Sequence, residues 1–302
     1  MGATSDKPHD ILCIGSVLWD VIGRSPEMMI AGNDRPGRIT RAPGGVALNI
    51  AMQLSQEGMR PGLLSVVGDD AAGRDLLAAC RAMGLGCAHL LVDADLVTDQ
   101  YMAVEAQGQL IAAIADAHSL EAAGARILAP LEDGRLASTG APWEGLMAID
   151  GNLTVALLGE IAENVAFARA DLRIAPASPG KAERLAVFLG HSRATLYVNC
   201  EEAGLISGRV VTCAETGARA MLAAGARRVL VTDGARAAVD ATPERIIARA
   251  PPLIQPRRVT GAGDTFMAAH IAAEARGVAP DDALEQALHT AASFVSGGAD
   301  DA

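Results

Sequence analysis

The chain has 302 residues, of which half are hydrophobic but only 3% are aromatic, so we expect one large domain with a core of small, tightly packed aliphatic side chains. Its 25 basic and 36 acidic residues give a formal charge of −11, which together with the lack of a basic stripe excludes a nucleic-acid polymer as the expected partner. A small phosphate-bearing ligand stays possible, because backbone N–H groups can bind it locally.

The hydrophobic pattern alternates between strands and helices along most of the chain. A short apolar run predicts a buried strand over 10–20, and apolar residues at helical spacing predict a helix over 46–59. The alternation continues with strands at 62–68, 145–151, 172–177, 195–200 and 227–233, and with helices at 73–84, 154–166, 181–190 and 214–225. This order predicts an α/β fold with a mainly parallel central sheet that is flanked by helices on both faces.

Two segments interrupt this alternation. Residues 20–40 lack helical periodicity, and residues 98–116 have the pattern of two strands, 99–106 and 109–116, joined by a turn at Gly108. We expect segments of about 21–40 and 98–117 to pair as a small β-sheet that covers a cleft as a lid. The 302 residues are therefore interpreted as a single domain with a β lid, whose exposed edge could pair with that of a second copy.

The clearest chemical signal is VTGAGDTFMAAHIAAEARG at 259–277, where Gly261, Ala262 and Gly263 precede Asp264 and an apolar helix. Small residues let the backbone approach a ligand, and a helix N-terminus supplies unpaired N–H groups and partial positive charge. These donors suit a transferring phosphoryl group, and an aspartate there can accept the proton of an attacking hydroxyl. Taken alone, the segment also fits a turn followed by a helix cap at Asp264.

Other nucleotide-binding signatures are missing from the sequence. No GxxxxGK[ST] motif is present, which argues against a P-loop enzyme. No GxGxxG motif follows the first expected strand, which disfavours a Rossmann oxidoreductase.

Six motifs, in the expected order and over nearly the whole chain, resemble those of the ribokinase-like (PfkB-type) family of sugar and nucleoside kinases. They are GSVLWD at 15–20, APGGVALNIA at 42–51, VGDDAAG at 67–73, VNCEE at 198–202, VTDG at 231–234 and VTGAGD at 259–264. The resemblance implies a ribokinase-like three-layer fold with a β lid. It also implies ATP and Mg²⁺ as cofactors and a hydroxymethyl group of a small sugar or nucleoside as the phosphoryl acceptor.

Roles follow for residues of five of these motifs, and further residues of the lid and of the C-terminal helix are expected to join them. Catalysis would depend on Asp264 as the base and on Gly261, Ala262 and Gly263. Substrate would be bound by Asp20, Gly44, Gly45 and Asn49, and by Thr98, Tyr101 and Asp116 of the lid. ATP would be bound by Asn199, Thr232, Gly234, Gly263, His289 and Ala292. Magnesium would be organised by Asn199 and Glu202, through water molecules.

Three further segments resemble the pseudouridine kinases of this family, namely 98–116, 147–153 and 174–185. They imply phosphorylation of the 5′-hydroxyl of free pseudouridine. The alternatives are another acceptor, such as ribose, a hexose, adenosine or inosine, and a non-catalytic ligand-binding regulator with the same fold. Many relatives carry Asp-Thr-Thr where this chain has Arg258-Val259-Thr260, and this difference argues against their monovalent-cation site.

The sequence also bears on the cellular setting. The first residues contain no apolar segment of the secretory type, and the five cysteines form no CxxC pair. No run approaches the roughly 18 apolar residues of a membrane span. We therefore expect a reducing, cytoplasmic setting.

Overall fold

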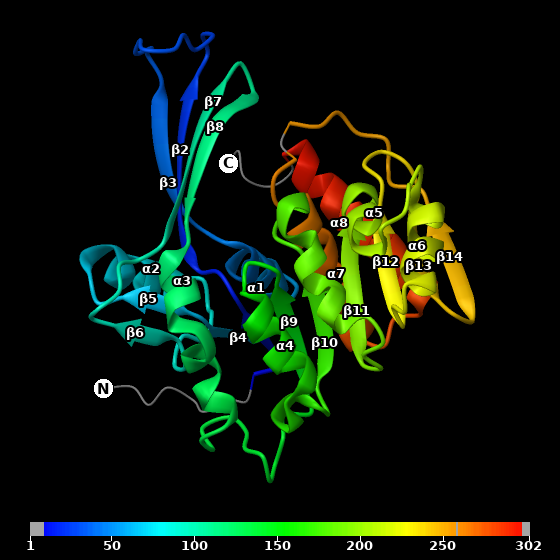
Figure 1. Ribbon diagram of the computed structural model, residues 1–302. Helices are drawn as coiled ribbons and strands as arrows, with labels where there is room; N and C mark the ends of the chain where they lie inside the picture. The colour runs from blue at the N-terminus through cyan, green and yellow to red at the C-terminus, as the bar shows by residue number, and fades with distance from the viewer. Residues whose placement is uncertain (1–8, 258, 298–302) are drawn as a thin grey trace.

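The computed structural model describes residues 9–257 and 259–297, and its largest element is a sheet of eight strands (Figure 1). The strand order is β14-β13-β12-β11-β10-β9-β1-β4, in which the six strands from β12 to β4 are parallel to one another, β13 is antiparallel to β12, and β14 is antiparallel to β13. The strands are β1 (Ile11–Ile14), β4 (Pro61–Leu64), β9 (Leu146–Asp150), β10 (Asp171–Ala175), β11 (Ala194–Asn199), β12 (Arg228–Thr232), β13 (Ala238–Thr242) and β14 (Arg245–Arg249).

Helices cover both faces of this sheet. One face carries α1 (Val46–Gln56), α2 (Ala71–Ala82), α7 (Ala262–Ala275) and α8 (Pro280–Ser296). The other carries α3 (His118–Ala123), α4 (Val155–Glu163), α5 (Cys200–Ser207), α6 (Ala214–Ala223) and the 3₁₀ helices η1 (Gly124–Leu131), η2 (Val165–Phe167) and η3 (Pro179–Phe188). Strand β1 is buried on both sides because alternate residues enter the two cores, Leu12 and Ile14 one of them, Ile11 and Cys13 the other. This is the three-layer arrangement that the sequence predicted.

A separate four-stranded sheet projects from the body and forms the lid (Figure 1). Its order is β3-β2-β7-β8, with β2 (Leu18–Ser25), β3 (Arg38–Gly44), β7 (Gln100–Ala106) and β8 (Gln109–Asp116). The two expected segments therefore pair through β2 and β7, which run parallel. The register aligns Asp20 of β2 with Ala42 of β3 and Tyr101 of β7.

The base of the lid is fixed to the body by side chains on both of its segments. The indole Nε1 of Trp19 donates to the carbonyl oxygen of Ala72 at 2.9 Å, and Arg41 lies 3.8 Å above the indole ring. On the second segment, Thr98 donates to the Asp70 carboxylate through its hydroxyl at 2.7 Å and through its backbone N–H at 2.9 Å. Because Asp70 also caps α2, the start of β7 is tied to the start of that helix.

Several expected element boundaries were wrong. The expected strand over 10–20 is two strands, because Gly15 adopts a φ of +144° and Ser16 turns toward Asp150, so that β2 leaves the central sheet. The expected strand over 62–68 also divides, since β5 (Val66–Gly68) pairs with β6 (Leu91–Asp93) in a separate ribbon. The expected helix at 181–190 is the 3₁₀ helix η3. Within the described residues, no helix is long and apolar enough to span a bilayer.

Candidate active site

The site lies where the parallel strands end. In the sheet, β12, β11, β10, β9 and β1 are neighbours and point the same way, so their carboxyl ends meet at one edge. Ligand sites of parallel α/β sheets lie at this edge. Thr232 and Asn199 end β12 and β11 and are direct register partners, whereas Asp150 ends β9 beside the turn that follows β1.

A direct contact joins two predicted residues that are 215 positions apart in the chain. The side-chain amide of Asn49, on α1, donates to Oδ2 of Asp264 at 2.9 Å. Asp264 lies in the first turn of α7, which packs against α1. The structure therefore brings the predicted catalytic aspartate and a predicted sugar contact together at one point.

Acidic groups lie near this contact and affect the ionisation of Asp264. Burial, together with the charges of Asp150, Asp20 and Glu202, raises the pKa of Asp264 to about 7 against the lowering effect of the Asn49 amide. Burial also raises the pKa of Asp20 to about 6 and that of Glu202 to about 7. The site is therefore acidic, but its carboxyl groups hold protons more tightly than exposed ones.

Glycines create the space beside Asp20 and at the start of α1. A Cβ on Gly44 would come within 2.2 Å of Oδ2 of Asp20, so this carboxylate depends on the missing side chain. Gly45 is the N-cap of α1 with a φ of +100°, and a Cβ there would lie 2.6 Å from the carbonyl oxygen of Ser16. Both predicted glycines are thus required by close contacts, and the acceptor side of the site is built from backbone at van der Waals distance.

The N-terminus of α7 supplies the predicted anion-binding donors only in part. Gly261 is the N-cap with a φ of +85°, in the left-handed region that favours glycine. The N–H of Ala262 donates to the carbonyl oxygen of Val259 at 3.1 Å and so belongs to the preceding turn. The N–H groups of Gly263 and Asp264 lie in the first turn, where a helix offers no internal acceptors. These two groups are the donors that a phosphoryl group would meet.

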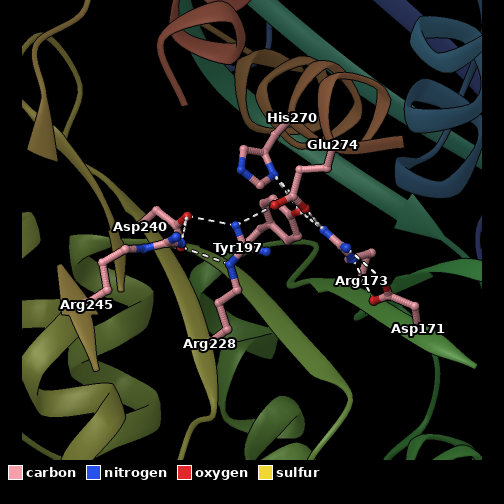
Figure 2. A network of polar contacts seen from close by, with 8 residues as sticks. All are labelled: Asp171, Arg173, Tyr197, Arg228, Asp240, Arg245, His270 and Glu274. Carbon is pink, nitrogen blue, oxygen red and sulfur yellow. Dashed lines mark hydrogen bonds and ion pairs between the residues drawn. The ribbon is translucent and has the colours of Figure 1, made fainter. Parts of the chain in front are cut away.

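A network of charged side chains fixes the second half of α7 to the sheet (Figure 2). Glu274 forms ion pairs with Arg173 of β10 and, at 2.7 Å, with Arg228 of β12. Tyr197 of β11 accepts a hydrogen bond from Arg173 at 3.1 Å and lies 2.9 Å from Nδ1 of His270. Burial lowers the pKa of His270 to about 4, so this ring is neutral at pH 7. Helix α7, which carries the predicted catalytic aspartate, is thereby tied to three neighbouring strands.

The two residues that were predicted to organise magnesium lie near this centre, at the start of α5. Asn199 and Glu202 form a reciprocal cap of α5, in which Oδ1 of Asn199 accepts from the Glu202 N–H at 2.9 Å and Oε2 of Glu202 accepts from the Asn199 N–H at 2.8 Å. The described residues contain no cluster of three or more His, Cys, Asp or Glu side chains suited to a metal. The second carboxylate oxygen of Glu202 is a hard donor that fits Mg²⁺ held mainly by waters and phosphates.

The lid residues divide between its two faces. Tyr101 shares a row with Asp20, and Asp20 together with burial raises the tyrosine pKa. Asp116 pairs with Gln100 in the next row, which belongs to the opposite face, and its carboxylate oxygen Oδ1 lies 2.7 Å from Nδ1 of His118. The Thr98 hydroxyl is buried and engaged with Asp70. The structure therefore groups Tyr101 with Asp20 but separates Asp116 from both.

The predicted adenine residues lie on α8. His289 is exposed and lines a shallow depression with Asp282, Glu285 and Gln286, whereas Ala292 is buried. Two residues beyond Ala292, the ring of Phe294 lies against Gly261, where a Cβ would come within 3.1 Å of it. Gly234 follows Thr232 in a turn with a φ of +60°. Arg258, from which the sequence argues against a monovalent-cation site, lies outside the described residues.

Three residues of the site were not predicted. Oδ2 of the fully buried Asp150 accepts a hydrogen bond from the Ser16 N–H at 2.8 Å, and the same oxygen lies 3.2 Å from the Asn152 amide nitrogen. The Ser16 hydroxyl in turn accepts from the N–H of Val46 at 2.9 Å, at the start of α1. For Asp150 the available signal was position, because it stands near the carboxyl end of an expected strand, as Asn199 does, whereas Ser16 fell inside the expected strand over 10–20.

Comparison with known proteins agrees with this geometry. The sequence model of the pfkB family of carbohydrate kinases matches residues 8–300. A pseudouridine kinase of Escherichia coli (strain K12) is 34% identical over 120 residues, which cover 39% of this chain and 38% of that protein. The chain thus matches well under half the length of this relative.

Solved structures match over almost the whole chain. A carbohydrate kinase from Agrobacterium tumefaciens has a TM-score of 0.78 and 27% identity, covering 95% of this chain and 92% of that one. The ribokinase of Arabidopsis thaliana, solved with ribose and ATP, has a TM-score of 0.78 and 19% identity over 96% of this chain and 93% of that one. The second likeness establishes the ribokinase-like fold.

Proposed function

Because the chain belongs to the pfkB family of carbohydrate kinases, we propose that it transfers the γ-phosphoryl group of ATP to the 5′-hydroxyl of pseudouridine, giving pseudouridine 5′-phosphate. The observation that carries the kinase assignment is the contact between Asn49 and Asp264 at the first turn of α7. It joins a carboxylate of raised pKa, a polar group for a sugar hydroxyl and unpaired helix N–H groups. The similarity to the E. coli pseudouridine kinase supports the choice of acceptor.

In the proposed reaction, Asp264 accepts the proton of the 5′-hydroxyl while this oxygen bonds to the γ-phosphorus. The bond from that phosphorus to the bridging oxygen of ATP breaks, and ADP leaves with its electron pair. A pKa of about 7 suits a base that must be ionised before the reaction and accept a proton during it. The N–H groups of Gly263 and Asp264 stabilise the charge that spreads over the transferred group.

The acceptor would lie between α1 and the lid. Asp20 and Asn49 would hold the ribose hydroxyls, and Tyr101 would face the base from the same side of the lid as Asp20. The lid positions beside Tyr101 and Ala103 on β8 are Ala115 and Ala113. These small side chains leave room beyond the sugar, which favours a nucleoside over free ribose. Closure of the lid would exclude water and limit hydrolysis of ATP.

On the nucleotide side, Asn199 and Glu202 would hold Mg²⁺ through water molecules. Bound with the nucleotide, Mg²⁺ would supply positive charge that offsets the phosphate charge. The other proposed nucleotide contacts are Thr232, Gly234, His289 and Ala292. A cytoplasmic location, proposed from the cysteine pattern, fits the use of intracellular ATP.

We also propose that two copies associate through their lids. The lid face opposite Asp20 carries Ile39, Met102 and Ile114, which are 79%, 47% and 62% exposed. Large exposed side chains that share one face mark interaction surfaces. Light scattering would give twice the monomer mass, and a monomer at micromolar concentration would contradict the pairing.

The acceptor is tested by measuring ADP release from ATP and Mg²⁺ with pseudouridine beside uridine, ribose, fructose, adenosine and inosine. We expect strong turnover with pseudouridine and little with uridine, which differs only in its glycosidic bond. Faster turnover with another acceptor would reject pseudouridine but keep Asp264 as the base. If no acceptor gives turnover and the protein still binds ATP, the non-catalytic regulator becomes the better reading.

A further inference from the structure

Lysine is rare in this chain, and one lysine lies at the edge of the site. Among the 25 basic residues only Lys7 and Lys181 are lysines, and Lys7 lies outside the described residues. Lys181 is in the first turn of η3, directly after the carboxyl end of β10. Its partly buried ammonium group donates to Oδ1 of Asn152 at 2.5 Å.

Hydrogen bonds continue from this lysine to the acidic centre. The amide nitrogen of Asn152 lies 3.2 Å from Oδ2 of Asp150 and 3.1 Å from the Ser16 hydroxyl. Among the neighbouring charges that raise the pKa of Asp264, the charge of Asp150 has the largest effect. Asn152 therefore links the Lys181 ammonium to the carboxylate of Asp150, whose charge raises the pKa of Asp264.

The strand order places Lys181 between the two halves of the site. The proposed nucleotide residues Asn199 and Thr232 end β11 and β12, whereas the acceptor residue Asp20 follows β1. Strands β10 and β9 lie between β11 and β1. The ends of these two strands, where Lys181 and Asn152 are found, therefore lie between the proposed nucleotide residues and the proposed acceptor residue.

The ammonium group also has capacity to spare. Within 9–257 and 259–297, no carboxylate forms an ion pair with Lys181 at 4.0 Å or less. An ammonium has three donors, and the described contacts use one of them. By contrast, Arg184 on the same helix donates at 3.1 and 3.0 Å to the carbonyl oxygens of Asn152 and Leu153, and so braces the loop itself.

We propose that Lys181 is a catalytic residue that donates to the γ-phosphoryl group of the nucleotide as it is transferred. This role builds on the proposed kinase activity and adds the positive side chain that the acidic site requires. The bonds made and broken are those of the transfer to the 5′-hydroxyl, with the proton going to Asp264. Lys181 keeps its own protons throughout, and its charge offsets the negative charge on the moving group. Asn152 positions the ammonium for this contact.

The first test compares Lys181→Met with Arg184→Met, which removes a positive charge from the same helix and loop. We expect Lys181→Met to lower kcat about 10²-fold. Calorimetry should show that the substitution weakens the binding of a non-hydrolysable ATP analogue much more than the binding of ADP. Lys181→Arg restores part of the loss because it keeps the charge. Arg184→Met keeps the wild-type preference for the ATP analogue over ADP, whatever its effect on Tm.

A second test uses the unmodified protein and does not depend on the folding of variants. An amine-acetylating reagent is applied, and the acetylation of Lys181 and Lys7 is followed by mass spectrometry. The ATP analogue should protect Lys181 several-fold more than ADP does, with no difference at Lys7. Equal protection by both nucleotides, or equal weakening of both in Lys181→Met, would overturn the assignment. Wild-type protein without turnover on any acceptor refutes the kinase activity instead, so the two failures are distinguishable.

Discussion

Replacement of Asp264 by asparagine should separate its chemical role from its cost to stability. Asparagine has nearly the same shape and can still accept the hydrogen bond from Asn49, which is 2.9 Å long in the wild type. It cannot take a proton from the attacking hydroxyl. We therefore expect kcat to fall by about 10²–10⁴, while affinity for ATP changes little.

The same substitution should stabilise the folded protein. The pKa of Asp264 rises from 3.8 to about 7 on folding, a shift of about three units. At 1.36 kcal/mol per pKa unit, this shift lowers the free energy of unfolding of the wild type by at most about 4 kcal/mol. Solvent and relaxation of neighbouring groups reduce this, so we expect a gain of about 1–2 kcal/mol and a rise in Tm of about 2–6 °C.

The size of this stabilisation depends on pH in a defined way. A carboxyl group whose pKa is raised in the folded state makes the protein lose stability as pH increases from the unfolded value to the folded value. The difference between Asp264→Asn and wild type should therefore be near zero at pH 4, grow up to about pH 7 and stay constant above it. Thermal unfolding followed by circular dichroism between pH 4.5 and 8.5 measures this difference.

Asn49→Asp is the matched control, because it adds a carboxylate beside Asp264 and should lower Tm over the same pH range. If Asp264→Asn unfolds at the same temperature as wild type at pH 8, the pKa of Asp264 is not raised in the folded protein. Turnover within a few-fold of wild type would show that Asp264 is not the base. These two results are independent of each other.

Three further outcomes follow from the site. For wild type, kcat/KM for the acceptor should rise tenfold per pH unit up to about pH 7 and then level off, because Asp264 must be ionised; a flat profile from pH 5.5 to 8 would contradict this. Gly44→Ala should lower kcat/KM about 10²-fold, since its Cβ would lie 2.2 Å from Asp20 Oδ2 and displace that carboxylate; unchanged acceptor kinetics would refute the role of Asp20. Glu274→Gln should lower the free energy of unfolding by about 3 kcal/mol in urea titrations at pH 7, because Arg173 and Arg228 lose a buried partner; the loss should vanish toward pH 2, where Glu274 itself becomes protonated.

Local signals in the sequence predicted the layers, whereas the resemblance to a kinase family supplied the candidate site residues, which stay predictions. Two of these residues also carry a local signal. Asp264 follows two glycines before an apolar helix, and Asn199 stands before a glutamate three positions on, which is a capping pattern. The parallel sheet then requires that residues after its strands share one edge. That rule does not cover Asn49, because α1 follows β3 of the lid sheet; Asn49 meets Asp264, 215 positions away, because α1 packs against α7.

What the sequence did not predict depends on contacts between distant segments. The first strand ends at Gly15, whose φ of +144° turns the chain away. Only glycine fits there, because a Cβ would lie 2.3 Å from Cβ of Asp150. Nothing near Gly15 in the sequence identifies that neighbour. Asp150 itself precedes a glycine and has the local pattern of a turn residue. The face of the lid that Asp116 occupies was equally hidden, since it depends on strand register.

The acidity of the site and the acidity of the whole chain pose one physical problem. A chain with a formal charge of −11 and with Asp20, Asp150, Glu202 and Asp264 at one centre should repel a nucleoside triphosphate. The raised pKa values reduce this repulsion, because at neutral pH Asp264 and Glu202 carry only part of their full charge. The positive end of α7 then acts at short range in a partly buried setting, where it is screened less than the surface charges are. A phosphoryl group can therefore be stabilised at this point by an acidic protein, provided that a cation such as Lys181 or Mg²⁺ accompanies it.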